Sequence, residues 1–211
     1  MKPIRLSWRL RHIFWNNVLT NNIILAQAIG ICPIVAGAYR LQYGVVLAIC
    51  TALVLVSTSL LMSLLGERLP QWLRPPVYTV VGSLVLWGSA WLLDTYLSSE
   101  IYAALYLYLP LMAVNALNYR VGGFATGNKP AIAVMDAVGT SIGFGAVICI
   151  VAAAREMLSF GTLWNMPLWG HPVLAQMDKP FAAFFMLAAL ATLLQGIRML
   201  RRGKEGGDEH A

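Results

Sequence analysis

The sequence predicts an all-α, polytopic membrane protein whose six transmembrane helices form two inverted three-helix repeats, with broken helices in spans 1 and 4. The first observation behind this prediction is composition. Of the 211 residues, 59% are hydrophobic and 11% are charged, and the mean hydropathy of +0.69 exceeds that of a soluble domain. The second is a set of six apolar runs, each near the ~20 residues that a spanning helix needs. They cover residues 23–39, 44–65, 77–97, 101–117, 131–154 and 181–200.

Residues 1–22 form a basic segment that precedes the first run. Trp8, Phe14 and Trp15 stand among its arginines, a pattern typical of an amphipathic segment on the inner membrane surface. No small-residue cleavage pattern follows, so we expect no removable signal peptide. The chain therefore divides into this segment, a transmembrane domain at 23–200 and a polar cytoplasmic tail at 201–211.

The first run carries Cys32 and Pro33 at its middle. A proline inside a helix removes one backbone hydrogen bond and clashes with the preceding turn. Neighbouring protein must then satisfy the freed backbone groups, because lipid cannot. From the residues alone, this pair is either a packing kink or a site.

The fourth run, at 101–117, is short. We expect either that its helix is broken or that neighbouring helices compensate for its short length in the membrane. It echoes the first run, since each has a proline and a buried amide within an apolar helix: Pro33 with Gln27, and Pro110 with Asn115. The two runs would cross in opposite directions, as in inverted repeats whose broken helices meet near the midplane. Coincidence explains the echo equally well on composition alone.

The connections between runs are marked by helix breakers and by tryptophan. Prolines punctuate the connection before the third run, and Gly122, Gly123, Gly127 and Pro130 mark the one before the fifth. The longest connection, at 159–180, holds Trp164 and Trp169, and we expect it on the outer membrane face because indoles favour that interface.

Basic residues predict that both termini are cytoplasmic. With that orientation the outer segments keep only Arg40, Arg155 and Lys179. The sequence pI of about 9.5 then reflects membrane topology rather than a nucleic-acid surface. The other basic residues fall inside: Lys2, Arg5, Arg9, Arg11, Arg68, Arg74, Arg120, Lys129, Arg198, Arg201, Arg202 and Lys204.

Few residues carry recognisable chemistry. The cysteines lie in apolar runs and predict no disulfide, and the histidines lie outside the runs without zinc-like spacing. No catalytic triad, phosphate loop or dinucleotide fingerprint is present, so we name no catalytic residue. Gln27, Asn115 and Asp136 are candidates for a polar or ion path. The structural alternatives are that the amides join helices and that Asp136 is a cap or surface group.

Several stretches together resemble a known family of membrane redox proteins. They are Gly30-Ile-Cys-Pro33, Arg74-Pro-Pro-Val-Tyr78, Met135-Asp-Ala137 through Gly143-Phe-Gly145, and Arg155-Glu-Met-Leu158 with Gly161-Thr-Leu163. In this order they resemble the E subunit of the Rnf electron-transport complex and the D subunit of the sodium-pumping NADH:quinone oxidoreductase. The Cys-Pro pair and the Gly-Thr-Leu ending resemble the Rnf version more closely.

The resemblance implies a cofactor and a partner. In that family, a cysteine in each of the two broken spans and the matching pair of a homologous subunit hold an iron–sulfur centre at the membrane midplane. Cys32 matches the first ligand, but Ala116 stands at the second position and cannot ligate. Cys50 and Cys149 are not obvious substitutes, being nearer the outer side. The loop expected at 120–125 also lacks the acidic residue usual in the family.

We therefore expect an inner-membrane subunit of an Rnf-type ion-translocating redox complex, not catalytic alone. It would share a [2Fe-2S] cluster with a homologous subunit of the Rnf A type and assemble with other Rnf or NQR subunits in the bilayer, without nucleic acid. One alternative is a diverged scaffold without a cluster. Another is a small secondary transporter built on the same inverted repeat.

Overall fold

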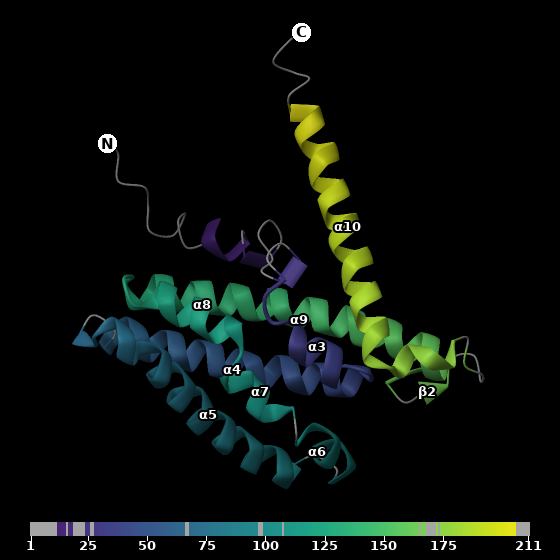
Figure 1. The fold of residues 1–211 in the computed structure, drawn as a ribbon, viewed down its shortest axis with the longest axis horizontal. Coiled ribbons are helices and arrows are strands. Elements are labelled where there is room, and N and C mark those ends of the chain that lie inside the picture. The colour runs from purple at the N-terminus through teal and green to yellow at the C-terminus, as the bar shows by residue number, and fades with distance from the viewer. Residues whose placement is uncertain are drawn as a thin grey trace.

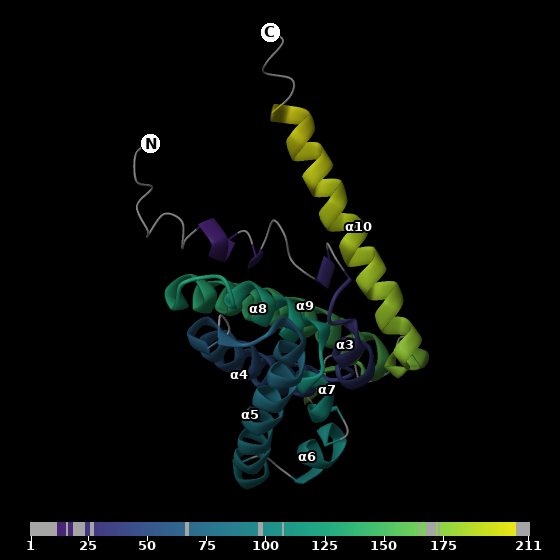
Figure 2. The same cartoon turned by 60° about the vertical axis from the view of Figure 1, so that its left-hand side comes forward.

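Two long antiparallel helices form the centre of the molecule. The computed structural model describes residues 12–15, 17–18, 24–25, 28–65, 68–96, 99–106, 108–164, 166–167, 172 and 174–205. Helices α4 (Leu41–Leu65) and α9 (Pro130–Phe160) make the most extensive helix contact and lie side by side in Figures 1 and 2. A Cβ added at Gly44 would lie 2.9 Å from the Ala152 Cβ. Small residues thus allow the two backbones to approach closely, as in many membrane helix pairs.

The remaining elements surround this central pair (Figure 1). Short helices α3, α7 and α8 pack against it, α5 crosses α4 at an angle, and a two-residue antiparallel hairpin follows α9 with Leu163 opposite Met166. In chain order the further elements are α3 (Ile31–Gly37), η3 (Gln71–Leu73), α5 (Arg74–Tyr96), α6 (Ser99–Leu105), α7 (Leu109–Ala113), α8 (Ala116–Ala125), β1 (Thr162–Leu163), β2 (Met166–Pro167), η4 (Ala175–Asp178) and α10 (Pro180–Glu205).

Four described helical stretches are long and apolar enough to cross a membrane: Leu41–Leu65, Gln71–Thr95, Pro130–Phe160 and Pro180–Ile197. They coincide with the second, third, fifth and sixth predicted runs, so the chain is a helical, multi-pass membrane protein. The first and fourth runs appear instead as short helical pieces, which confirms that these two spans are broken. The count of six spans stays a prediction.

Helix α9 continues six residues beyond the predicted end of its run at 154. Arg155 and Glu156 ended the apolar run in the sequence, but both side chains are buried and hydrogen-bonded to other elements. A helix can therefore pass through these charges. Helix α10 likewise continues to Glu205, past the boundary predicted at 200.

The glycines at 122 and 123 lie inside α8, so the loop expected at 120–125 is wrong. Val121 is fully buried, and a Cβ added at Gly122 would lie 2.9 Å from the ring of Tyr78. This close approach of α8 to α5 favours glycine within the helix. The connection to α9 is confined to residues 126–129.

Helix α10 leaves the bundle after its first turns in both views (Figures 1 and 2). Ala182, Ala183 and Leu187 are buried at its base, whereas Phe185 and Leu193 are exposed. Most of this apolar helix therefore faces the surroundings rather than the protein, where lipid or another protein of a complex would lie.

Candidate functional site

The break in the first span lies before Pro33, not at it. Gly30 has φ +83°, in the left-handed region, and α3 begins at the next residue. Pro33 is the third residue of α3, within the first turn, where backbone N–H groups have no partner inside the helix. The proline is therefore tolerated, and the predicted break at this residue is corrected to residues 28–30. Cys32 is in the same turn and is exposed.

The break in the fourth span likewise lies just before a short helix. Helix α7 ends at Ala113, and α8 begins at Ala116 after the extended residue Asn115. The Asn115 Oδ1 accepts a hydrogen bond from the Leu117 N–H at 3.3 Å and so caps α8. Pro110 lies in the first turn of α7. Ala116, the first residue of α8, is exposed.

The two breaks meet. A Cβ added at Gly30 would collide with the side chain of Leu117 and would lie 3.4 Å from the Asn115 Oδ1. Gly30 is two residues before Cys32, while Asn115 and Leu117 flank Ala116. The structure therefore joins the starts of α3 and α8 at one junction, and Cys32 and Ala116, which are close to it in the chain, are both exposed.

Asn118 secures the broken fourth span. Its Nδ2 donates to the Ala113 carbonyl at 3.1 Å and to the Tyr78 carbonyl at 3.0 Å. The first bond satisfies a carbonyl group at the C-terminal end of α7, and the second attaches the residues of the break to α5. Within the described part of the chain, the buried Asn115 Nδ2 and Asn118 Oδ1 have no hydrogen-bond partner.

Asp136 is the centre of a buried polar cluster near the N-terminal end of α9. Its side chain is 2% exposed, and one carboxylate oxygen lies 2.9 Å from the Arg120 Nη1 of α8. The other accepts from the Asn17 Nδ2 at 2.6 Å. Arg120 also donates to the Thr140 Oγ1 at 3.1 Å. The structure thus pairs Asp136 with a cation and an amide, rather than placing it at the surface.

Two members of this cluster were missed from the sequence. We assigned Arg120 to the inner basic residues of a connection, whereas it lies inside α8, and Asn17 was not singled out. A cation on an otherwise apolar helix next to glycines is the only sequence signal for Arg120. Among the other candidates, Asn115 caps α8, and Gln27 lies outside the described residues.

The cysteines and other ligand-type residues do not form a metal site on their own. Within the residues that the structure describes, no group of three or more His, Cys, Asp or Glu side chains is placed to hold a metal ion. Cys50 is buried in α4 and Cys149 is half-buried in α9. Among the described residues, Cys32 therefore belongs to no such group.

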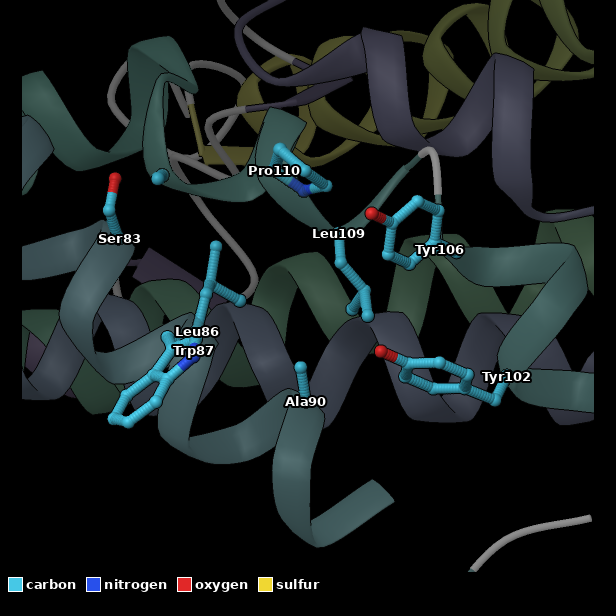
Figure 3. Close-up of a pocket in the computed structure, with 9 residues that line it drawn as sticks. Ser83, Leu86, Trp87, Ala90, Tyr102, Tyr106, Leu109 and Pro110 are labelled. Atoms are coloured by element: carbon cyan, nitrogen blue, oxygen red, sulfur yellow. The ribbon is translucent and has the colours of Figure 1, made fainter. Parts of the chain in front are cut away.

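An apolar cavity of about 240 Å³ lies beside the fourth-span break, between α5, α6 and α7 (Figure 3). Its lining residues are mostly apolar, with two tyrosines and one serine: Ser83, Leu86, Trp87, Ala90, Tyr102, Tyr106, Leu109, Pro110 and Ala113. The cavity has a mostly apolar lining, and none of its lining residues is charged.

Comparisons with known proteins agree with one another. The family model described as "Rnf-Nqr subunit, membrane protein" matches residues 10–191. The chain is 31% identical over 196 residues to a protein of Shewanella sp. (strain ANA-3) that is named as the E subunit of an ion-translocating oxidoreductase complex, covering 89% of this chain and 84% of that protein. It is 31% identical over 156 residues to the protein of the same name in Aliivibrio fischeri (strain MJ11), covering 74% of this chain and 68% of that protein.

Proposed function

Because this chain belongs to the Rnf-Nqr family of membrane subunits, we propose that it acts within an Rnf-type ion-translocating electron-transport complex. Its role there is to hold, together with a homologous membrane subunit of the A type, a [2Fe-2S] centre between the broken spans. The observation that supports this role best is the junction of α3 and α8, because it presents the Cys32 thiol outward, where a partner protein can reach it.

The residues present fit one ligand of such a centre. Cysteine thiolates are the usual ligands of iron–sulfur clusters, and four complete the set. This chain supplies Cys32, and Ala116 supplies nothing at the second position. The chain's own contribution is then to hold one thiol at a rigid junction, while the partner provides the other ligands. When bound, the centre would relay electrons near the middle of the bilayer.

A second candidate function is a scaffold that keeps the fold and has lost the cluster. Ala116 favours it, because a centre with one ligand from this chain is incomplete by the family pattern. The buried Arg120–Asp136 pair and the Asn118 hydrogen bonds would then serve only to keep the shape that other subunits bind. The two functions predict different metal contents.

Cys32→Ala in the purified complex separates these functions. We expect loss of the electron paramagnetic resonance signal of the centre and lower iron and sulfide contents, because a thiolate is removed from the ligand set. Cys149→Ala, which removes a half-buried thiol of α9, is the matched control and should change neither quantity.

A centre unchanged by Cys32→Ala would refute the proposed ligand and favour the scaffold. Ala116→Cys extends the same comparison. More iron with retained assembly indicates a site that has lost one ligand, whereas unchanged iron with poorer assembly indicates that Ala116 is a packing residue.

We propose Asp136, with Asn115 and Gln27, as part of a polar path for the coupling ion. Asp136 is the only one of the three that carries a charge, and buried carboxylates within spans often belong to ion routes. A cation arriving there would compete with Arg120 for the carboxylate. Ion transport that is unaffected by Asp136→Asn, in a complex that still transfers electrons, would contradict this path.

Both termini are proposed to lie in the cytoplasm of a bacterial cell, with the protein in the inner membrane. The imbalance of basic residues supports this orientation, because Lys and Arg accumulate on the cytoplasmic side. Reporter fusions after Gly203 and after Trp164 should therefore report opposite sides of the membrane. Finding both reporters on the same side would refute the topology.

A further inference from the structure

Helix α3, which carries Cys32, is too short to be stable by itself. It has seven residues, and isolated helices of this length are unstable because nucleation costs more than a few hydrogen bonds return. The carbonyl groups at its C-terminal end also have no partners inside the helix. Something outside α3 must supply donors to these carbonyls.

Arg155 supplies them. Its Nη1 donates to the carbonyl oxygens of Ile34, Val35 and Ala38, at 3.4, 3.2 and 3.1 Å. Its Nε and Nη2 donate to the backbone carbonyl oxygens of Met177 and Asp178 in η4, at 3.2 and 2.6 Å. A guanidinium group has five N–H donors in a rigid fork, and here that fork joins α3 to η4.

The placement suits the electrostatics of the helix end. The C-terminal end of a helix carries partial negative charge, which a cation stabilises. Arg155 is 1% exposed, so neither water nor lipid replaces these contacts. The next residue, Glu156, accepts from the Leu41 N–H at the start of α4 at 2.8 Å. Two consecutive residues of α9 thus hold the end of α3 and the beginning of α4.

The other half-helix at the junction does not depend on such a residue. Helix α8 has ten residues, and residues just after it close its end. The Thr126 Oγ1 donates to the Gly122 carbonyl at 2.9 Å, and the Asn128 Nδ2 donates to the Phe124 carbonyl at 2.8 Å. Of the two half-helices, α3 is therefore the one whose C-terminal carbonyl groups are held by a side chain far away in the chain.

From these contacts we propose that Arg155 is a positioning residue for Cys32, fixing α3 from its C-terminal end while Gly30 fixes its beginning against Leu117. The effect of Arg155 on a metal centre rests on the function proposed above. The effect of Arg155 on the mobility of α3 does not depend on that function.

The test uses a nitroxide spin label on Cys32 of the full chain in membranes, with Cys50 and Cys149 replaced by alanine. Arg155→Gln should narrow the lines of the label's spectrum. The carbonyl groups at the C-terminal end of α3 lose the hydrogen bonds that the guanidinium donates, so α3 moves more freely. Lys179→Gln is the matched control: it removes a positive charge from an exposed residue between η4 and α10 and should leave the spectrum unchanged. A label on Cys149, with the other two cysteines replaced, reports whether α9 stays intact.

Narrowing at Cys32 without narrowing at Cys149 supports the proposal. No change at Cys32, or equal narrowing at both labels, would overturn it, since Arg155 would then be unimportant or would hold the whole fold. If Arg155→Gln yields no folded chain, Arg155→Lys decides. A single ammonium cannot reach both α3 and η4, so intermediate narrowing supports the proposal and a native spectrum opposes it.

A second readout separates this inference from the proposed function. In the assembled complex, Arg155→Lys should shift the g values of the iron–sulfur signal while iron content is retained, because Cys32 is displaced rather than removed. An unshifted signal would oppose the positioning role. A complex without iron would refute the proposed function, while the label at Cys32 would still decide the role of Arg155.

Discussion

Replacing Gly30 with alanine should destabilise the protein by about 2–4 kcal/mol, through backbone strain and overpacking together. Gly30 has φ +83°, a conformation that L side chains rarely adopt, and an added Cβ would collide with the Leu117 side chain. Leu117 is itself fully buried, so it cannot move aside without disturbing the start of α8. The measurement is the free energy of unfolding in mixed micelles of a mild detergent and sodium dodecyl sulfate.

Gly123→Ala is the matched control for Gly30→Ala. Gly123 lies in α8 with a normal helical conformation, and nothing lies within 4 Å of an added Cβ. Alanine has a higher helix propensity than glycine by about 1 kcal/mol, so we expect no loss and a small gain. If both variants unfold at the same free energy, the junction of the two breaks is not tightly packed, and the geometry proposed for Cys32 fails with it.

Arg120→Leu should cost about 3 kcal/mol of unfolding free energy, the lower end of the range for breaking a buried ion pair. The substitution leaves the Asp136 carboxylate, 2% exposed, with Asn17 but without its cation. We take the lower end because the Arg120 side chain is 29% exposed and part of the pair is screened. The same micelle unfolding experiment measures the loss.

A double substitution identifies the cause of this loss. Adding Asp136→Asn to Arg120→Leu removes the uncompensated charge, so it should restore most of the stability, and Arg120→Lys alone should be milder because it keeps the charge. If the double variant is as unstable as Arg120→Leu, the loss comes from other contacts of the arginine side chain, such as those with Thr140 and the Phe124 ring. A native stability for Arg120→Leu would show that the pair contributes nothing.

Much of the fold follows from properties that each segment carries by itself. Hydropathy and length predict the four spanning helices within a few residues, because the bilayer requires about 20 apolar residues whatever the neighbours are. The expectation that the first and fourth spans are broken was also correct. The family resemblance, drawn from motifs in order along the chain, is confirmed by the family match over residues 10–191.

Local properties failed where a backbone or a charge is satisfied by a distant partner. Proline is the local signal of a break, yet Pro33 and Pro110 both lie in the first turn of a helix piece, and the breaks come at Gly30 and Asn115. In the sequence, Asn115 was a candidate for a polar path and Gly30 part of a family motif. Neither was predicted as the position of a break, which becomes visible only when Gly30 packs against Leu117.

The amino-acid sequence alone was enough to predict a helical membrane protein, the segments that cross the bilayer, and the cysteine that is a candidate ligand. The pairing of Arg120 with Asp136, and the contacts of Arg155 with the end of α3 more than 110 residues away in the chain, emerged only from the folded structure. Hydrophobicity and helix length act within a segment, whereas a buried charge is stable only when packing brings a particular partner to it. Such pairings become visible once the helices are in place.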